Sequence, residues 1–365
     1  MSLLLKAFLG VQGAIFSKKA PCLQWRLLKD GIRDPYRHFA IEEALLRGID
    51  TGETVPTLRL RQVEPSVFIG VYQYAEEDVD VAYCAAKSIK IVRRPNPGGA
   101  VYQDAGSFCY SLFCPKEFLF KRANVHEAEQ LYPIIGRAVI ETCRDFGVKA
   151  ELSPVNDITI GGRKVYGSAQ VEFYGAFVHS GTFLVKTDLE EMERCLKPSR
   201  LKFSDKGFQD VKSRVINLCD AIGKDIEISE VMEKLVFHMG EFLQVDFYEA
   251  GLMAEEIQAA DSLYNEKYSD PAWTFRKKDS YTVVVSTKAR SGVITLEVSL
   301  EGDVMMDVHI KGDFLVPDQG ELSRVISSLK GKSFFIASEI AADSCLPVDI
   351  REALSGLLKS IKDEI

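Results

Sequence analysis

Two arginines followed by a glycine-rich loop form the first stretch of the sequence that could do chemistry. Arg93 and Arg94 end a predicted strand, and the loop contains Gly98, Gly99, Ala100, Val101 and Tyr102. Glycines let backbone N–H groups approach a ligand closely, and a guanidinium suits a carboxylate or a phosphate. The stretch therefore fits an anion-binding loop, with a plain connection between strands as the alternative. It is not a P-loop, because the GxxxxGK[ST] pattern is absent.

A second stretch places polar residues around a tight turn. Asn156 and Asp157 precede Gly161–Gly162, and Lys164 opens the returning segment, a pattern typical of a β-hairpin. Because side chains alternate along a strand, we expect a polar face with Lys164, Tyr166, Ser168 and Gln170, and a core face with Val165, Ala169 and Val171. Gly167 inside the strand indicates a close approach to the backbone. A lysine there can hold a carboxylate and a phosphate together, and the alternative is a solvated surface lysine.

A third stretch contains His179 in an apolar strand, followed by Ser180 and Gly181. Such a histidine is either a structural residue or a base. No partner can be assigned to it from spacing, so a Ser-His-Asp or Cys-His triad is not supported. The eight cysteines form no CxxC pair and no zinc-finger spacing, and we interpret them as reduced core thiols of an intracellular protein.

The elements that must position these residues alternate between strands and helices. Apolar periodicity predicts strands at 25–28, 57–63, 67–72, 89–94 and 109–113, and a β-rich block over 149–186. Residues 57–63 alternate strictly, as a half-buried strand does. Helices are expected at 36–48, 79–88, 125–146, 189–196, 228–243 and 254–268. After a linker at 269–274, strands are expected at 281–285, 292–298 and 304–310, and helices at 321–329 and 348–362.

The composition is typical of a globular protein. Of 365 residues, 46% are hydrophobic and 27% charged, and the net charge is −8. The overall field therefore does not draw the chain to nucleic acid or to an anionic membrane. No segment reaches the ~20 apolar residues that span a bilayer. Residues 1–24 carry three lysines and no acid. We expect a disordered extension there, with an organellar presequence as the alternative.

Taken together and in this order, the stretches resemble motifs of the lipoate–protein ligase A family. Residues 93–104 resemble RRxSGGGAV(Y/F)HD, residues 156–169 resemble NDxxxxGRKxxGSA, and residues 179–184 resemble HHGTLL. Residues 206–218 resemble KGIxSVRSRVxNL, and the end of the chain resembles the small accessory domain of the family. Each motif alone is weak, but four in order at similar spacing are specific.

The resemblance implies an α+β fold class. Residues 25–268 would form a mixed-sheet catalytic domain of the biotin/lipoate ligase type, residues 269–365 a small α+β accessory domain, and residues 1–24 an extension. The implied enzyme converts lipoate and Mg-ATP into lipoyl-AMP and pyrophosphate. It then transfers the lipoyl group to a lysine of an apo lipoyl domain of a 2-oxoacid dehydrogenase E2 subunit, or of the glycine cleavage H protein. The implied location is the cytoplasm, with organellar import through residues 1–24 as the alternative, and neither a nucleic-acid partner nor a membrane span is expected.

The matched motifs also imply residue roles. Lys164 would be the catalytic residue, touching both the lipoyl carbonyl and the α-phosphate. ATP and the adenylate would contact Arg94, Gly98, Gly99, Ala100, Val101, Tyr102, Asn156, Asp157 and Lys164. Asp157 would also hold Mg²⁺. Lipoate would contact Arg94, Lys164, Gly167, Ser168, His179 and Gly181. No protein nucleophile is required, because the adenylate is itself the activated acyl donor.

Three departures from the motifs keep other functions open. Asn96-Pro97 replaces Ser-Gly, which stiffens the loop, Gln103 replaces a histidine, and Ser180 stands where a second histidine is common. One alternative is an octanoyl- or lipoyl-transferase of the same superfamily, whose cysteine nucleophile has no counterpart within 149–157; Cys143 is the nearest and is expected in the core. Another transferase alternative uses preformed lipoyl-adenylate. The third alternative is a non-catalytic relative that binds lipoate.

Overall fold

The computed structural model describes residues 23–153, 155–173, 175–197, 212–277 and 279–364. Most of the expected extension at 1–24 and the first half of the motif at 206–218 lie outside these residues. Leu23 and Gln24, expected in the extension, instead open the first strand. None of the described helices is long and apolar enough to cross a membrane.

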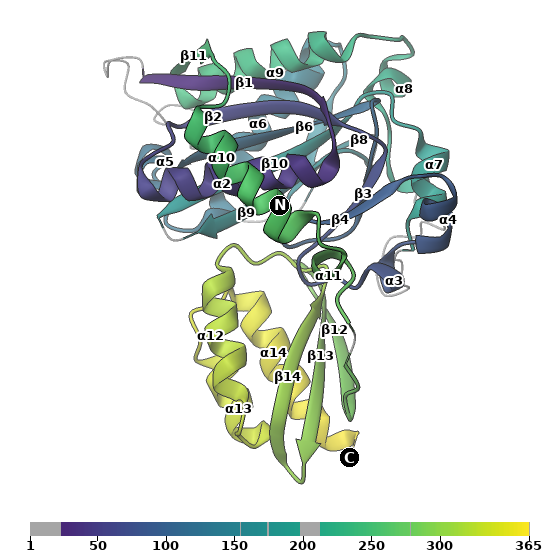
Figure 1. The fold of residues 1–365 in the computed structure, drawn as a ribbon, viewed down its shortest axis with the longest axis vertical. Helices are drawn as coiled ribbons and strands as arrows, with labels where there is room; N and C mark the ends of the chain where they lie inside the picture. The colour runs from purple at the N-terminus through teal and green to yellow at the C-terminus, as the bar shows by residue number, and fades with distance from the viewer. Residues whose placement is uncertain (1–22, 154, 174, 198–211, 278, 365) are drawn as a thin grey trace, which may run out of the picture.

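Within the described residues, a mixed sheet of eight strands forms the centre of the larger domain (Figure 1). The strands are β1 (Leu23–Arg33), β2 (Thr57–Val63), β6 (Ser107–Pro115), β7 (Ala150–Ser153), β8 (Asp157–Ile160), β9 (Arg163–Phe173), β10 (Ala176–Leu184) and β11 (Val245–Glu249). Their order is β11-β1-β2-β6-β10-β9-β8-β7. β1 pairs in parallel with β11 and β2, and the other neighbours pair antiparallel.

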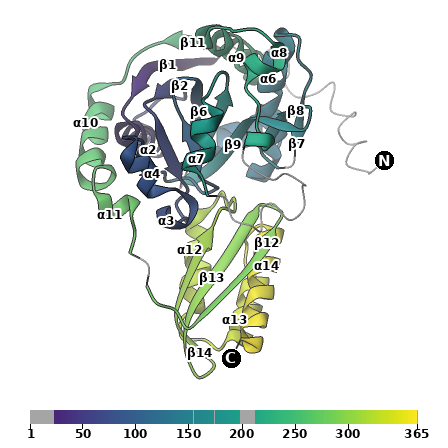
Figure 2. The same ribbon diagram turned by 90° about the vertical axis from the view of Figure 1, so that its right-hand side faces the viewer.

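Helices cover both faces of this sheet. α6 (Leu131–Asp145) and α9 (Ile228–Leu243) share an apolar core with one face, and α2 (Pro35–Thr51) and α10 (Ala254–Leu263) share another core with the opposite face (Figures 1 and 2). α2 begins where the Asp34 side chain accepts two backbone N–H bonds, and it ends at Gly52 with φ +78°, which is typical helix capping. The shorter helices are α3 (Ala75–Asp78), α4 (Val81–Ala86), α5 (Lys116–Ala123), α7 (Leu189–Cys195), α8 (Leu218–Ile222) and α11 (Pro271–Thr274).

A small three-stranded sheet carries the glycine-rich loop. It consists of β3 (Ser66–Ile69) between β4 (Lys90–Arg93) and β5 (Val101–Gln103). β3 pairs in parallel with β4 and antiparallel with β5. The loop therefore leaves the end of β4 and returns through β5 on the other side of β3, which fixes both of its ends.

The C-terminal domain, drawn in light green and yellow in Figure 1, has its own hydrophobic core. Its antiparallel sheet consists of β12 (Val283–Ala289), β13 (Gly292–Glu301) and β14 (Val304–Gly312). Its helices are α12 (Gln319–Leu329), α13 (Phe334–Ala342) and α14 (Val348–Ser360). The domain contacts the larger one through specific pairs: Lys311 Nζ lies 2.8 Å from Glu77 Oε1, and the rings of Tyr72 and Phe314 stack with centroids 5.1 Å apart.

The expected fold class, a mixed sheet with helices plus a C-terminal domain of strands and helices, is confirmed. The strand at 57–63 and the helix at 228–243 have the expected bounds. The continuous helix expected at 125–146 is wrong, because a 3₁₀ turn at Ala128–Gln130 precedes α6. We also missed the α5, α13 and β11 elements. The expectation that β2 is half-buried is wrong as well, since Arg59 and Arg61 are only 0% and 3% exposed beneath α2.

Candidate active site

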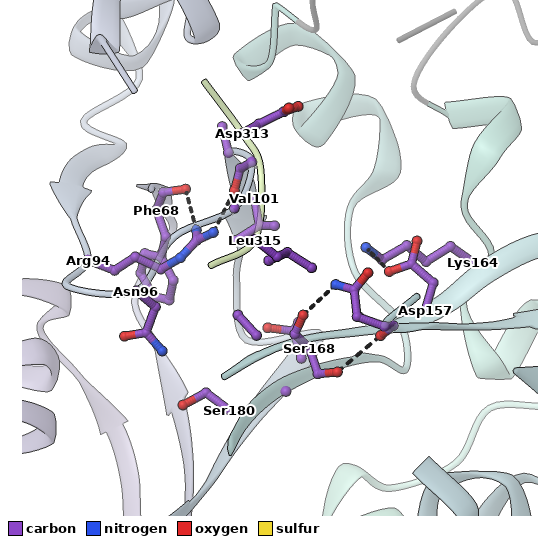
Figure 3. Close-up of a pocket in the computed structure, with 18 of the residues that line it drawn as sticks. Phe68, Arg94, Asn96, Val101, Asp157, Lys164, Ser168, Ser180, Asp313 and Leu315 are labelled. Carbon is purple, nitrogen blue, oxygen red and sulfur yellow. Dashed lines mark hydrogen bonds and ion pairs between the residues drawn. The ribbon is translucent and has the colours of Figure 1, made fainter. Parts of the chain in front are cut away.

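One cavity of about 430 Å³ brings the three chemical stretches together. Among the predicted site residues, those that line it are Arg94, Gly98, Gly99, Ala100, Val101, Tyr102, Asn156, Asp157, Lys164, Gly167, Ser168 and Gly181. Arg94 and Lys164 point into the same space from opposite walls (Figure 3). His179 is the one predicted site residue that does not line it. The glycine-rich stretch is therefore more than a plain connection between strands, while Lys164, 35% exposed, lines the cavity from a partly solvated position.

Arg94 organises the glycine-rich loop from within. Its guanidinium donates to the carbonyl oxygens of Phe68 at 3.3 Å, Pro97 at 3.1 Å and Gly99 at 2.9 Å (Figure 3). Burial lowers the pKa of Arg94 to about 10, so the group stays charged at neutral pH. No described carboxylate forms an ion pair with Arg94. A positive charge held by carbonyls alone is a suitable partner for an anionic ligand.

The loop itself needs glycine at two points of close contact. Gly98 has φ +106°, a conformation that side chains disfavour. A Cβ on Gly70 would lie 2.0 Å from the carbonyl oxygen of Gly98. The loop is therefore pressed against the end of β3. The Pro97 that distinguishes this loop from the family motif lies beside Gly98, and its carbonyl is one of the three that hold Arg94.

Lys164 lies on the facing wall in a tight polar group. Lys164 Nζ is 2.7 Å from Asp157 Oδ1. Asn156 Nδ2 donates to the Ser168 carbonyl at 2.5 Å, and Ser168 Oγ donates to the Asn156 carbonyl at 3.0 Å. A Cβ on Gly167 would lie 2.3 Å from Lys164 Nζ, so the lysine folds back across a residue without a side chain. The close approach expected at Gly167 is to this lysine.

A register shift in β9 corrects the predicted faces of this strand. Asp157 pairs with Gly167 and Ile158 with Tyr166, but Thr159 pairs with Lys164, so β9 contains one extra residue here. Such a bulge changes which face the following side chains occupy. Lys164 and Tyr166 therefore do not share a face: Lys164 lines the cavity, whereas Tyr166 is 1% exposed in the core with Val165. Ala169, expected on the core face, lines the cavity.

His179 supports the cavity wall instead of lining it. Its ring nitrogens lie 3.0 Å from the Tyr166 hydroxyl and 3.0 Å from Gln170 Nε2. Burial lowers the pKa of His179 to about 3, so its imidazole is neutral and cannot act as a base at physiological pH. Tyr166 in turn fills the space beside Gly181, where a Cβ would lie 2.4 Å from the tyrosine ring. His179 can therefore affect a ligand only indirectly, through the residues that it holds in place.

Sequence reasoning missed a buried ionic cluster at the other end of the cavity. His38 and Glu42 of α2 and Arg61 of β2 line the cavity there. Arg59, on the same strand, donates to Glu42 Oε1 at 3.0 Å and to Asp30 Oδ2 at 2.7 Å. Arg59 and Arg61 alternate with leucines in the sequence, a pattern that predicts solvent-facing arginines. Only the acidic pair Glu42-Glu43, inside the otherwise apolar stretch 39–46 of α2, could have indicated partners for them.

Two loops of the C-terminal domain also reach the cavity, and no sequence pattern had indicated this. They contribute Arg290 and Ser291 between β12 and β13, Gly292 at the start of β13, and Asp313 and Leu315 after β14. Leu315 Cδ2 would lie 3.2 Å from a Cβ on Gly98, so this domain packs on the glycine-rich loop (Figure 3). The described part of the 206–218 motif reaches the site too: Ile216 N donates to the Lys164 carbonyl at 2.9 Å.

The cysteines near the site are poor nucleophiles. Cys143 is fully buried in α6, and burial raises its pKa to about 12. Cys109 lines the cavity, but burial raises the pKa of its thiol, and its Sγ contacts Gln103 and Thr182 at 3.5 Å. Since the thiolate is the attacking form, neither residue is set up for thioester chemistry.

Residues 34–240 match the family model of the lipoyl protein ligase A/B catalytic domain. The chain belongs to this family. Among curated relatives of this chain, lipoate–protein ligase 1 of Staphylococcus aureus is 27% identical over 78% of this chain and 83% of its own length. Lipoate-protein ligase LplJ of Bacillus subtilis is 26% identical over 90% of this chain and 95% of its own.

Solved structures agree with this assignment. The bi-partite lipoate protein ligase of Thermoplasma acidophilum, studied with its E2 lipoyl domain, is 29% identical with a TM-score of 0.61, over 72% of this chain and all of that chain. A lipoate-protein ligase A bound with ATP is 29% identical with a TM-score of 0.60, over 69% of this chain and 99% of that chain. Plasmodium falciparum LipL1 is only 16% identical but shares the fold, with a TM-score of 0.72 over 93% of this chain and 99% of its own. The resemblance seen in the motifs is confirmed.

Proposed function

We propose that this chain is a lipoate–protein ligase that makes lipoyl-AMP from lipoate and ATP and transfers the lipoyl group to a lysine of an acceptor protein. The observation that carries the proposal is the placement of Arg94 and Lys164 on opposite walls of one cavity, with the glycine-rich backbone beside them. Relatives named lipoate–protein ligases, one of them bound with ATP, support it.

The first half-reaction brings two anions together. The lipoate carboxylate oxygen bonds to the α-phosphorus of ATP, the bond from that phosphorus to the bridging oxygen breaks, and pyrophosphate leaves. Arg94 and the backbone from Gly98 to Tyr102 would hold the phosphates, and Lys164 would offset the charge that develops between carboxylate and α-phosphate. Preorganised positive groups aimed at the developing charge are effective at this task. Gly167, Ser168 and Gly181 would position the lipoyl part of the substrate.

In the second half-reaction the neutral ε-amine of the acceptor lysine attacks the acyl carbon. The bond from that carbon to the phosphate oxygen breaks, AMP leaves, and the amine proton passes to solvent. Lys164 would now offset charge on the carbonyl oxygen and on AMP. The buried, protonated thiols of Cys109 and Cys143 take no part in either step.

Mg²⁺ is included in the proposal as the partner of ATP. Among the described residues no group of three His, Cys, Asp or Glu could hold a metal ion, so no all-protein site exists there. Magnesium commonly binds one or two carboxylates together with substrate phosphates, and Asp157 beside Lys164 fits as such a single carboxylate. The ion would neutralise phosphate charge, and Asn156 would fix the loop through its two bonds with Ser168.

We propose the E2 lipoyl domain as an acceptor, supported by the E2 lipoyl domain of the Thermoplasma system, and the glycine cleavage H protein as a second acceptor. Residues 25–268 would be the catalytic domain and 269–365 the accessory domain. A buried core of the larger domain ends at Tyr268, and the buried core of the C-terminal domain begins at Val283. This separation supports the division. The cytoplasm stays our proposed location, with import through residues 1–24 as the alternative.

The test is the intact mass of an apo lipoyl domain after incubation with this protein, lipoate and Mg-ATP. We expect a lipoyl mass gain that disappears without ATP. Transfer only from supplied lipoyl-adenylate or from an acyl-carrier donor would instead make the chain an acyltransferase. Failure with every donor, on both a lipoyl domain and H protein, would favour the lipoate-binding alternative.

A further inference from the structure

The ionic cluster at the far end of the cavity lies in line with the proposed reaction centre. Register places Asp157, Gly167, Thr182, Cys109 and Arg61 side by side in one row across β8, β9, β10, β6 and β2. All five line the cavity. Three strand spacings separate Gly167 from Arg61, about 14 Å at ~4.8 Å each. The cavity therefore extends across the sheet from Lys164 to Arg61.

Small side chains leave room for an acyl chain along this row. Gly167, Thr182 and Cys109 lie on it, with Ala169 and Ser180 in the neighbouring row. An extended chain advances about 1.2 Å per bond, so an eight-carbon acid spans roughly 9 Å from its carboxyl carbon. With its carboxylate at Lys164 over β9, such an acid ends over β6, where Arg61 and Glu42 close the cavity.

The Arg61 guanidinium has few strong partners at that end. Its Nε donates to His38 Nδ1 at 3.1 Å, and Arg59 Nη1 also approaches this nitrogen, at 3.3 Å. His38 Nδ1 must therefore be an acceptor. Burial, with the two arginines, holds the pKa of His38 well below its usual range, so the neutral ring carries its one proton on Nε2.

This tautomer leaves donors of Arg61 available. Arg61 Nη2 lies 3.4 Å from His38 Nε2, but two N–H groups cannot bond to each other. Its remaining contact is Glu42 Oε1 at 3.4 Å, and Nη1 reaches the Arg59 carbonyl at 3.4 Å. Glu42 is already used by Arg59 at 3.0 Å and by Ser111 at 2.8 Å. By contrast, Arg93 places its nitrogens on five carbonyls at 2.5–3.1 Å.

We propose that Arg61 selects the acyl acid by its far end, favouring a medium-chain acid whose distal end carries a neutral hydrogen-bond acceptor over one that ends in a methyl group. The dithiolane sulfurs of lipoate are weak acceptors of this kind, and a hydroxyl is a strong one. A methyl group would leave the available Arg61 donors with only their long contacts, which is costly for a buried charged group. A second carboxylate is disfavoured, because it would lie beside Glu42. The proposal rests on the proposed function, since it needs the carboxylate at Lys164.

The test compares 8-hydroxyoctanoate with nonanoate, which differ by a hydroxyl in place of a methyl group. We expect kcat/KM for ATP-dependent pyrophosphate release to be about tenfold or more higher with the hydroxy acid, and lipoate to exceed octanoate. An apolar pocket would give the opposite order. In Arg61→Met the preference should reverse toward nonanoate, whereas Arg61→Lys should retain part of it. Arg33→Met, which removes an arginine that pairs with Asp30 outside the cavity lining, should leave the ratio unchanged.

The outcomes separate the two proposals. Pyrophosphate release with none of the acids would overturn the proposed function. Release with equal rates for both acids, or faster with nonanoate, would overturn the role of Arg61 and leave the ligase standing. Should Arg61→Met not fold, the wild-type ratio and Arg61→Lys still decide: an unchanged ratio in a folded Arg61→Lys protein also counts against the proposal.

Discussion

Adding one methyl group at Gly167 should displace the proposed catalytic lysine without unfolding the protein. In Gly167→Ala the new Cβ would lie 2.3 Å from Lys164 Nζ and 2.4 Å from its Cε. Ordinary contact begins near 3.4 Å, so the ammonium must move by about 1.1 Å, the difference of these two distances. Because it is the far end of a flexible side chain, the ammonium will move and the strand will stay.

The two consequences differ greatly in size. A misplacement of about 1 Å in a reacting group costs roughly a hundredfold in rate, so kcat/KM for adenylate formation should fall by about that factor. Stability should hardly change. Lys164 and Asp157 are 35% and 31% exposed, and a pair so exposed contributes about 0–1 kcal/mol. Alanine in place of a strand glycine returns about 0.5–1 kcal/mol.

The assay is pyrophosphate release at saturating ATP, with a thermal melt of the same preparation. Gly356→Ala in α14 is the matched control, since its Cβ would meet nothing within 4 Å. It should raise the melting temperature slightly and leave activity unchanged. Wild-type adenylation by a folded Gly167→Ala protein would refute the reasoning, because the place of Lys164 beside Asp157 would then not matter for the reaction.

Three further outcomes follow from the site. Lys164→Ala should melt like wild type and lose at least about a hundredfold in adenylation; ATP-dependent activity at the wild-type level would contradict its assigned role. Cys143→Ser should retain transfer to a lipoyl domain because burial raises the pKa of Cys143 to about 12, whereas a folded but inactive variant would support a thioester mechanism. Burial lowers the pKa of His179 from 6.5 to about 3, so below pH 6.5 only the unfolded chain takes up this proton. The free energy of unfolding, measured in urea, should therefore fall by about 2 kcal/mol from this residue between pH 6.5 and pH 5, and His179→Gln should remove that part; an identical pH slope in the variant would argue against it.

The sequence predicts well that the motif residues lie together in one site, because each motif has a distinctive local chemistry. Paired arginines before glycines, and a lysine after a Gly-Gly turn, indicate an anion site wherever the chain places them. The Gly161–Gly162 hairpin has the positive φ angles, +57° and +79°, that such a turn requires. The bulge at Lys164 was not predictable, since one extra residue in a pairing depends on the partner strand and leaves no mark in the strand itself.

Burial by a distant element explains the other failures. Arg59 and Arg61 alternate with leucines and so looked exposed, but α2 covers that face and supplies Glu42 to compensate their charge. The helix α13, FFIASEIAA, has apolar residues on every side, with Phe335 and Ile336 more than half exposed, so it shows no periodicity to detect. The wall that Arg290 and Leu315 add to the cavity depends on how two domains dock, which a local pattern does not encode.

Arg93 fixes the start of the linker, so docking of the C-terminal domain is an intramolecular equilibrium. Arg93 binds the carbonyls of Trp273 and Thr274, and the Trp273 indole donates back to the Arg93 carbonyl at 2.9 Å. Only the short stretch from there to Val283 tethers the domain, and short tethers give effective concentrations in the millimolar range. An interface with a Kd near 0.1 mM would then stay closed about nine-tenths of the time at any protein concentration. A ligase in two separate parts must reach the same occupancy through affinity and abundance, whereas this chain reaches it through covalent connection.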